Sequence, residues 1–573
     1  MAAEISSISA DTSQFEVIII GAGPIGLVSA LQLGRAGIRT LLLERRATFS
    51  VHPKASGIHA RTMEIYRQLE LAPTILQNSV NYKGAFSVGW MTRMGGIELG
   101  SLTVGETQEE IDLLHSWSPE MITFCSQDIY EPLFAEALKR YPSVTLRLAA
   151  EVTAIAQDDS GVTVSYRSPD GEKSARGEYA IGADGVRSPT RKRLGITESG
   201  LEAFGDSINV IFNADLEKQR AGREYGLFWI VNGDTQGAFG YRRRGNSWSY
   251  NFEAGHGEDP AIYTPDRCVG LVRAAAGVPD LDVEVVSILH WQHDQSVTDQ
   301  WRARRVFLAG DAAHRFPPHG GFGMNSGVQD SQNLVWKLVA ALRWGAGDRL
   351  LDSYEAERKP VAQRNGEQCI LNTRRMEQTG WLLKDAKALA SLETPEGEPL
   401  REKMRQAVPA QREQFFSQGQ QFGQIYTSSA TIDDGTPAEE SSVSIYHPTG
   451  HPGARAPHTW LEGGESGDRS TIDLYNGGFV LLAGRDGKPW CTAAATVSDA
   501  IAAPLAAFCI NSPGYMQRSG DKPWEDLVGV GPSGALLIRP DGHVGARWAT
   551  LPEDPVGELS AALRDILDLK AAA

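Results

Sequence analysis

The chain has 573 residues, of which 41% are hydrophobic and 22% are charged, with 60 glycines and 29 prolines. This composition is that of an ordinary globular protein, which excludes disorder, collagen and a coiled coil as descriptions of the whole chain, and the length predicts two to four domains. The net charge of −16 repels phosphate backbones and anionic lipid surfaces, so we expect no nucleic-acid partner and no membrane association.

The start of the chain and its cysteines favour a reducing compartment. Residues 1–14 lack the basic start and apolar core of a secretory signal, and we expect a frayed leader there. The longest apolar run near the start, Val17 to Gly23, is too short to cross a membrane. No two cysteines form a C-x-x-C pair, so we expect a cytoplasmic protein without a disulfide framework or a metal site. The cysteines are Cys125, Cys268, Cys369, Cys491 and Cys509.

The first predicted elements form a βαβ unit. An apolar strand from Phe15 to Ile20 leads into a glycine-rich turn and a helix from Leu27 to Ala36, and a second strand, Arg39 to Leu43, ends at Glu44. The turn has the spacing G-x-G-x-x-G, which lets the backbone approach a pyrophosphate at the helix N-terminus, and Glu44 stands where a carboxylate binds a ribose hydroxyl. A tight turn without a ligand is the alternative. The glycines are Gly21, Gly23 and Gly26.

Two later strands also end at carboxylates. Tyr179 to Gly182 is followed by Asp184, and Val306 to Ala309 is followed by Asp311. Each carboxylate could accept hydrogen bonds from a polyol, although a turn or helix-cap role is about as probable for either one alone. A glycine-rich segment after Asp311 opens a helix whose free N–H groups could face partial negative charge. Its residues include Gly323, Met324 and Asn325.

The rest of the chain predicts an antiparallel sheet, a linker and a second domain. Strand-like, aromatic-rich stretches fall between residues 207 and 252. Gln, Ser, Thr and Glu dominate from residue 411 to about 445, which is typical of a linker. We therefore predict domains at 1–410 and 446–573, with a substrate sheet built from about 85–115 and 200–295 interleaved in the first.

The three nucleotide-binding segments together resemble the group A flavoprotein monooxygenases, the single-component aromatic hydroxylases built like para-hydroxybenzoate hydroxylase. The resemblance implies an α/β, FAD-binding Rossmann-like fold of the glutathione reductase type, with the substrate sheet interleaved. It assigns the ADP half of FAD to Gly21, Gly23, Gly26 and Glu44. By the same analogy Asp184 serves both FAD and the nicotinamide cofactor, Asp311 holds the ribityl chain, and the flavin ring contacts Gln127, Gly323, Met324 and Asn325.

The branch that this chain most resembles is that of the phenol, chlorophenol and polyketide hydroxylases. The segment from Arg61 to Glu64, the run that begins at Gly310 and Asp311, and a C-terminal extension carry this resemblance. Arg61 could reach the flavin or pair with Glu64. In relatives the extension is thioredoxin-like. Cys491 has no partner two or three residues away, so we expect the extension to serve packing or dimer contacts, without dithiol chemistry.

The implied activity is hydroxylation of a phenolic ring, often ortho to its hydroxyl, with NADPH or NADH and O2 through a C4a-hydroperoxyflavin. A small phenolic or polyketide-derived substrate needs a base, and the aspartate that phenol hydroxylases use is replaced here by Ser56. Tyr241 and Tyr250 are the catalytic candidates, with core packing at least as probable for each. A flavin halogenase, whose Trp-x-Trp-x-Ile-Pro signature is missing, and a non-catalytic flavin-binding protein are the alternatives. A homodimer is left open.

Overall fold

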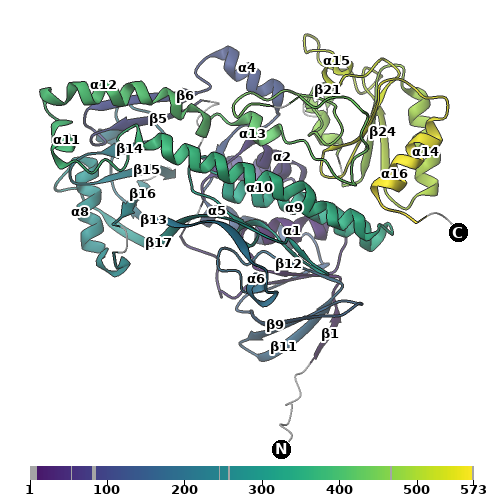
Figure 1. The fold of residues 1–573 in the computed structure, drawn as a ribbon, viewed down its shortest axis with the longest axis horizontal. Helices are drawn as coiled ribbons and strands as arrows, with labels where there is room; N and C mark the ends of the chain where they lie inside the picture. Colours follow the sequence, from purple (N-terminus) through teal and green to yellow (C-terminus); the bar gives the residue numbers. More distant parts are fainter. Residues whose placement is uncertain are drawn as a thin grey trace, which may run out of the picture.

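The computed structural model describes residues 10–52, 55–80, 85–243, 246–255, 258–439, 441–464, 467–475 and 477–570. Figure 1 shows three regions: a large, mostly antiparallel sheet at the left, a mostly parallel sheet with its helices in the centre, and a small α/β domain at the right. The long helix α10 (Asp348–Glu377) runs from the large sheet across the centre toward the small domain, and α9 (Phe322–Arg343) packs against it in the centre.

The central sheet contains the predicted βαβ unit. Its order is β18-β19-β12-β2-β3-β8, and the strands from β19 to β8 pair in parallel. Val17 and Ile19 of β2 pack in the core under the helices, whereas Ile18 and Ile20 pack in the core of the opposite face. The strands are β2 (Val17–Ile20), β3 (Thr40–Leu43), β8 (Val144–Arg147), β12 (Tyr179–Gly182), β18 (Arg302–Ala303) and β19 (Val306–Leu308), and the covering helices include α1 (Pro24–Arg35) and α5 (Gln127–Leu138).

A four-stranded sheet of order β1-β11-β10-β9 covers that opposite face. Its first strand, β1 (Ala10–Gln14), pairs in parallel with β11. The prediction of a frayed leader is therefore wrong for residues 10–14, and residues 1–9 lie outside the described part. The edge of a sheet offers unpaired backbone N–H and C=O groups, and a segment of any sequence can hydrogen-bond to them. The strand therefore needs no apolar pattern, and none was present in the sequence to predict it. The others are β9 (Glu151–Gln157), β10 (Val162–Ser168) and β11 (Gly171–Gly177).

The large sheet has eight strands in the order β20-β17-β13-β16-β15-β14-β5-β6. Its strands come from separate parts of the chain, and strands of the central sheet lie between these parts in the sequence. Helix α8 (Pro265–Ala276) covers one face, and the other face is turned toward α10 and the central region. The strands are β5 (Phe86–Met91), β6 (Glu98–Val104), β13 (Glu198–Asn213), β14 (Leu227–Val231), β15 (Gln236–Arg243), β16 (Ser247–Ala254), β17 (Glu284–Thr298) and β20 (His314–Arg315).

The C-terminal domain is thioredoxin-like. Its sheet has the order β24-β23-β25-β26, with β23 and β24 parallel and the other pairs antiparallel. The connection between β23 and β24 is helix α14, and α16 packs against α14 beside the sheet. The elements are β23 (Phe479–Ala483), α14 (Lys488–Ala500), β24 (Leu505–Cys509), α15 (Trp524–Val528), β25 (Ala535–Ile538), β26 (Val544–Trp548) and α16 (Pro555–Ile566), with a hairpin of β21 (Trp460–Gly464) and β22 (Gly467–Ser470).

Cys491 lies beside another cysteine of this domain, at a sequence separation larger than the two or three residues considered above. It lies in the first turn of α14, and Cys509 ends β24; their Sγ atoms are 3.0 Å apart. The search for a partner two or three residues away misses this pair because the crossover from helix to strand brings together residues 18 positions apart.

The predicted linker is packed against both domains. Gln420 and Gln421, in α13 (Gln418–Phe422), are buried, as is Tyr426. The Gln420 amide N–H donates to Asn365 Oδ1 at 2.8 Å, and the Gln421 amide N–H donates to Ser417 Oγ at 3.1 Å. A low apolar content thus does not keep this segment in solvent, because buried glutamines can bond to neighbouring polar groups.

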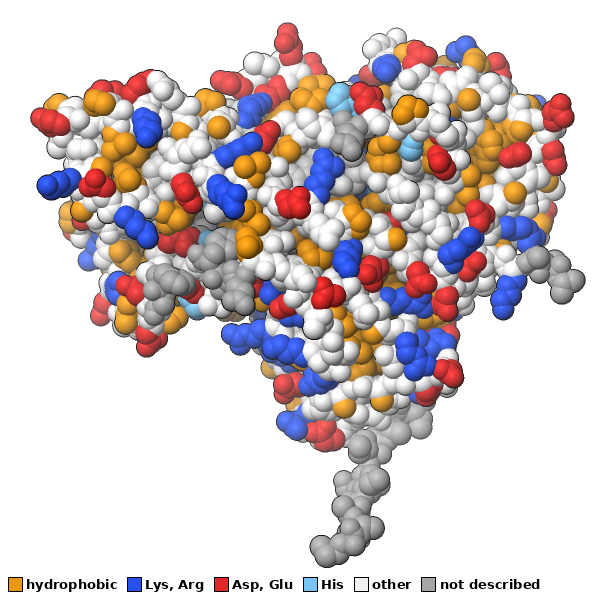
Figure 2. Space-filling view, in the orientation of Figure 1, with side chains coloured by type: hydrophobic (Ala, Val, Ile, Leu, Met, Phe, Trp, Pro, Cys, Tyr) orange, Lys and Arg blue, Asp and Glu red, His pale blue; other side chains and the backbone are white. Residues whose placement is uncertain are grey.

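The remaining elements cover the edges and connections. Among the described residues, no helix is long and apolar enough to span a membrane. Acidic and basic side chains are interspersed over the face drawn in Figure 2. The other elements are α2 (Ala60–Gln68), α3 (Ala72–Gln77), α4 (Gln108–Trp117), α6 (Pro189–Arg193), α7 (Glu217–Arg220), α11 (Ala386–Ser391), α12 (Glu398–Ala407), β4 (Gly57–Ile58) and β7 (Thr123–Phe124), with 3-10 turns that include η2 (Gly310–Ala312).

Candidate active site

Four predicted ligand positions lie at one edge of the central sheet. Gly21 follows β2, Glu44 follows β3, Asp184 comes just after β12, and Asp311 comes just after β19. These strands are neighbours in the order β19-β12-β2-β3 and run in parallel, so their carboxyl ends meet. In open α/β sheets, ligands bind at this edge.

The glycine-rich turn has room for a phosphate group. Gly21 has φ of +103°, which favours glycine, and a Cβ on Gly26 would lie 1.9 Å from the Gly21 carbonyl oxygen. A Cβ on Gly23, in contrast, would meet nothing within 4 Å. Glu44 Oε2 accepts the Ala22 N–H at 2.9 Å, so the carboxylate stands beside the turn. This open backbone at a helix N-terminus fits the pyrophosphate and ribose of FAD.

Asp184 and Asp311 come from loops that contact each other. Asp184 accepts the Ser188 hydroxyl at 2.5 Å, so its carboxylate also stabilises the start of α6. Arg191 of α6 donates to the Ala312 carbonyl at 3.0 Å, which ties this loop to the turn that holds Asp311. Asp311 itself is half-buried. The helix-cap alternative is thus realised for Asp184, and its position beside the turn is compatible with a cofactor contact as well.

The start of α9 is bound to residues 55–59, which we call the 55–59 segment. Asn325 Oδ1 accepts the His59 N–H at 2.9 Å, and its Nδ2 donates to the Gly57 carbonyl at 3.0 Å. A Cβ on Gly323 would meet nothing within 4 Å, so the backbone is open at the first turn of the helix. Met324 Sδ accepts the Tyr66 hydroxyl at 3.7 Å. The predicted contacts to the flavin ring therefore surround an accessible helix N-terminus.

Gln127 lies against the same segment. Its backbone N–H donates to the Ala55 carbonyl at 3.0 Å, and its side chain donates to Glu131 Oε1 at 2.6 Å. Its neighbour Asp128 binds Arg242 of β15 through both carboxylate oxygens, at 2.9 and 2.8 Å. Sequence reasoning missed Arg242, which joins the large sheet to the flavin-ring region. Its position in a run of three arginines was the available signal.

The face of the large sheet that is turned away from α8 presents polar groups. Register places Trp229, Ala238, Asn251, Asn209 and Leu289 in one row across five strands, because directly paired residues share a face. Trp229 Nε1 and Asn209 Oδ1 are buried and have no hydrogen-bond partner among the described residues. Such buried groups are normally satisfied by protein or by water, so each has hydrogen-bonding capacity left for a water molecule or a ligand. We call these five residues the polar row.

His319 connects the polar row to the start of α9. Its ring stacks on Trp229, with centroids 5.9 Å apart and planes inclined by 13°, and it lies three residues before Phe322, where α9 begins. His319 Nδ1 is bonded to the Thr373 hydroxyl at 2.9 Å, whereas the buried Nε2 has no partner in the part of the chain that the structure describes. His319 thus links the row to the helix that carries the predicted flavin-ring contacts.

The comparisons with known proteins agree with this geometry. The family profile described as "FAD binding domain" matches residues 14–368, and that described as "Aromatic-ring hydroxylase, C-terminal" matches residues 449–569. The chain belongs to the FAD-dependent group A aromatic-ring hydroxylases. Its cofactor is FAD, and the hydroxylase is an oxidoreductase.

Individual relatives match the hydroxylase over nearly its whole length. Tetracenomycin A2 monooxygenase-dioxygenase of Streptomyces glaucescens is 35% identical, with 97% of each chain covered. 4-Methyl-5-nitrocatechol 5-monooxygenase of Burkholderia sp is 33% identical, covering 96% of this chain and 97% of the relative. The flavin-dependent monooxygenase PieE, solved in complex with FAD and substrate, superposes with a TM-score of 0.90 at 30% identity, covering 98% of this chain and 100% of that one.

The two tyrosines predicted as catalytic lie on the other face of the sheet. Tyr250 is fully buried in the core beneath α8, and its hydroxyl is bonded to Thr235 Oγ1 at 2.7 Å. Tyr241 packs on Trp248, with centroids 4.9 Å apart. In both cases the packing alternative describes the position found. Alternation along β15 puts Tyr241 on the α8 side with Phe239 and puts Arg242 on the opposite face, where it binds Asp128. The structure argues against both as the base.

A hydrogen-bonded triad lies on the polar face and was missed by sequence reasoning. Ser207 Oγ is 2.6 Å from His293 Nε2 and 3.2 Å from Glu253 Oε1. Burial raises the pKa of Glu253 to about 7 and lowers that of His293 to about 4. Burial, with a smaller contribution from the nearby His293, also lowers the pKa of His319 to about 3. The triad residues are far apart in sequence, so only strand register brings them together.

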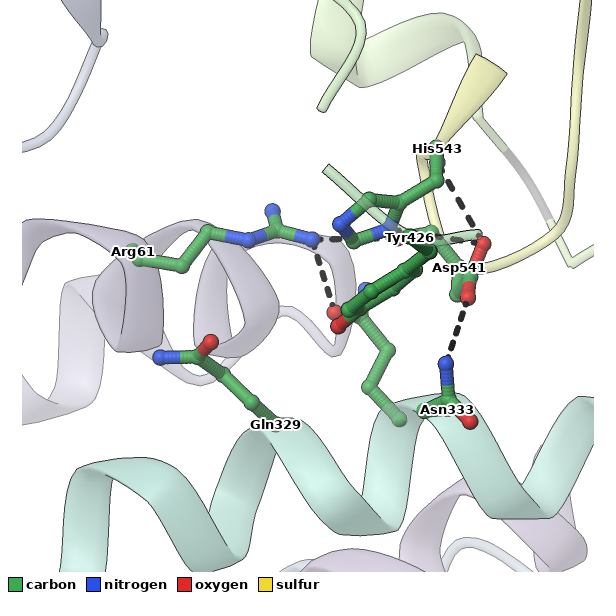
Figure 3. Close-up of a pocket in the computed structure, with 7 residues that line it drawn as sticks. Arg61, Gln329, Asn333, Tyr426, Asp541 and His543 are labelled. Carbon is green, nitrogen blue, oxygen red and sulfur yellow. Dashed lines mark hydrogen bonds and ion pairs between the residues drawn. The ribbon is translucent and has the colours of Figure 1, made fainter. Parts of the chain in front are cut away.

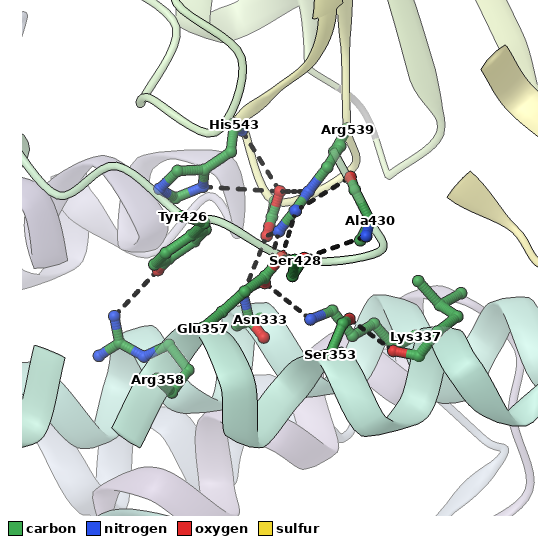
Figure 4. A network of polar contacts seen from close by, with 12 residues as sticks. Asn333, Lys337, Ser353, Glu357, Arg358, Tyr426, Ser428, Ala430, Arg539 and His543 are labelled. Carbon is green, nitrogen blue, oxygen red and sulfur yellow. Dashed lines mark hydrogen bonds and ion pairs between the residues drawn. The ribbon is translucent and has the colours of Figure 1, made fainter. Parts of the chain in front are cut away.

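The C-terminal domain is joined to the hydroxylase core by buried ion pairs. Arg61 binds Glu64 at 2.9 Å, which is the pairing alternative predicted for it, and also donates to the Asp541 carbonyl at 3.0 Å (Figure 3). Glu357 of α10 accepts Lys337 at 2.7 Å and Arg539 at 2.6 and 2.9 Å (Figure 4). This domain therefore contacts α2 and α10, and both of these helices pack against α9, which carries Gly323, Met324 and Asn325.

Proposed function

We propose that the hydroxylase adds one oxygen atom to a phenolic, polyketide-derived aromatic ring, with NADPH or NADH as reductant and O2 as oxidant. The observation that carries this proposal is the polar row with its unsatisfied buried groups, placed through His319 beside the start of α9. When bound, FAD takes electrons from the nicotinamide and supplies the oxygen-transfer chemistry. The names of the relatives, which include a tetracenomycin A2 monooxygenase-dioxygenase and a nitrocatechol monooxygenase, support an aromatic substrate.

The length of the polar row favours a substrate with several fused rings. From Trp229 on β14 to Leu289 on β17 the row crosses four inter-strand spacings, or about 19 Å at about 4.8 Å each. A single phenol would contact only one end of such a row. Trp229 offers an aromatic face, and Asn209 and Asn251 offer amide groups for carbonyl and hydroxyl substituents. These residues would bind and orient the ring system.

We assign the removal of the phenolic proton to Glu253, Ser207 and His293. A neutral imidazole can accept a proton at one nitrogen and release it from the other, and the serine hydroxyl can pass it to the carboxylate. The Ser207 and His293 side chains are almost fully buried, while that of Glu253 is 15% exposed, so the triad leads from the interior toward solvent. A carboxylate with a pKa near 7 is suited to accept a proton at neutral pH.

Substrate-stimulated NADPH oxidation with product masses tests this function. Polycyclic phenols of the polyketide type should stimulate NADPH use more strongly than single-ring phenols, and each product should gain one oxygen atom. Asn251→Leu should raise KM for the polycyclic substrate at least tenfold, because a row amide is lost. Asn213→Leu, at the end of β13 and bonded to Glu284, is the matched control and should change KM little. A protein that binds FAD but shows no stimulated oxidation with any of these phenols would contradict the proposal.

A further inference from the structure

The C-terminal domain holds two thiols in contact. Cys491 Sγ and Cys509 Sγ are 3.0 Å apart, and both side chains are partly exposed. A disulfide bond is about 2.05 Å long, so closing it requires the sulfurs to approach by about 1 Å. The other three cysteines of the chain are buried. The pair is therefore both close enough to bond and accessible to small reagents.

The two thiols differ in their surroundings. Cys491 is in the first turn of the 13-residue helix α14. Burial, together with the adjacent Cys491, raises the pKa of Cys509 to about 12. Cys509 accordingly keeps its proton, and Cys491 is the sulfur that reacts with an oxidant.

The two cysteines belong to different elements of secondary structure, unlike the cysteines of a C-x-x-C dithiol. One cysteine is on the helix and the other is at the end of the neighbouring strand β24. A bond between them would fix the start of α14 to the sheet. Trp490, next to Cys491, is buried in the core that the C-terminal domain shares with the FAD-binding part, so the bond would also restrain this contact.

We propose that Cys491 and Cys509 form a reversible disulfide and are a redox-modification site of the C-terminal domain, with a hydroperoxide as oxidant and a small thiol as reductant. The Cys491 thiolate attacks the peroxide, the O–O bond breaks, and an alcohol or water leaves as Cys491 becomes a sulfenic acid. The Cys509 thiol then displaces water from that sulfenic acid to form the S–S bond. Two electrons pass from the two sulfurs to the peroxide, and two molecules of added thiol return them.

Peptide mapping of the full-length protein tests the pair directly. Trypsin cleaves after Arg485 and Arg518 but not between Lys488 and Pro489, so one peptide, 486–518, contains both cysteines and none of the others. After treatment of the native protein with hydrogen peroxide, that peptide should be lighter by two hydrogen atoms and resist alkylation. The five thiols counted in denaturant should fall to three, and dithiothreitol should restore all five.

Cys491→Ser and Cys509→Ser are the matched variants. Each has four thiols. Cys491→Ser should keep all four under the same treatment, whereas Cys509→Ser should lose at most one, because its Cys491 sulfenic acid has no second thiol to bond and is returned to the thiol by dithiothreitol. The peptides that contain Cys125, Cys268 and Cys369 serve as internal controls and should stay alkylatable. Five alkylatable thiols after peroxide treatment, sulfonic acids in place of the intrapeptide bond, or loss of two thiols in either single variant would each overturn the proposal.

Discussion

Arg455 of the C-terminal domain binds Glu64 of α2, donating from Nε to Oε2 at 3.0 Å and from Nη2 to Oε1. Both side chains are buried. Helix α2 begins directly after the 55–59 segment, whose backbone is bonded to Asn325. The C-terminal domain thus holds the helix that positions one wall of the flavin-ring region, although none of its own residues belongs to the polar row.

Arg455→Met should destabilise the protein by about 3 kcal/mol, because Glu64 would stay buried with Arg61 as its one remaining cationic partner. FAD should also dissociate at a lower temperature than in the wild type. Thermal unfolding followed by flavin fluorescence measures both effects. Arg518→Met removes an exposed arginine of the same domain and should change stability by less than about 1 kcal/mol. Equal melting curves for both variants would contradict the structural role of Arg455.

The Arg455–Glu64 pair also predicts that the folded protein loses stability at acid pH. Burial raises the pKa of Glu64, but the charges of Arg455 and Arg61 outweigh it and hold the pKa below its usual 4.5. A carboxyl group whose pKa is lowered on folding stabilises the protein above its unfolded pKa. This contribution should therefore be complete above pH 4.5 and decrease as the pH falls through the lower pKa of the folded state. A smaller loss of stability in acid for Arg455→Met than for the wild type would confirm the linkage, and equal losses would contradict it.

Sequence patterns were sufficient to predict that the glycines, Glu44 and the two aspartates share one sheet edge, and insufficient to predict which side chains of the large sheet face away from α8. The glycines, Glu44 and the two aspartates follow short buried strands, so local order alone put them at one edge. Tyr250 and Glu253, by contrast, differ by three positions on one strand and point to opposite faces. Which face is covered by α8 is decided by packing that no short pattern contains.

Asp311→Ala should weaken FAD binding by about 1.5 to 3 kcal/mol if its carboxylate accepts a ribityl hydroxyl, or about 10- to 150-fold in Kd. Titration of the apoprotein with FAD, followed by quenching of flavin fluorescence, gives this value. Asp299→Ala, at an exposed carboxylate bonded to Thr197 and Ser199, is the control and should leave the Kd unchanged. An unaltered Kd for Asp311→Ala would place the ribityl contact elsewhere.

Glu253→Gln should remove the rise of kcat with pH near neutrality. The carboxylate accepts a proton only when ionised, and its pKa is raised to about 7, so wild-type turnover should increase as the pH passes through 7. At pH 7.5 the variant should be slower by roughly 100-fold, and it should recover partly at higher pH as the phenol ionises without help.

Tyr250→Phe is the comparison for that variant. It removes a buried hydroxyl from Thr235 and should cost about 1 to 3 kcal/mol of stability, with the pH profile of kcat retained. If Tyr250→Phe flattened the profile and Glu253→Gln did not, the tyrosine would be the base after all.

Isotopically heavy O2 tests the central claim most directly. The purified, FAD-loaded hydroxylase would be supplied with NADPH, a polycyclic phenol that stimulates NADPH oxidation, and heavy O2 in ordinary water. The mass of the product would then be measured by mass spectrometry. The account predicts one heavy oxygen atom in each hydroxylated ring, in a position next to the phenolic hydroxyl. A product whose new oxygen comes from water, or NADPH oxidation that yields only hydrogen peroxide with every aromatic substrate, would contradict it.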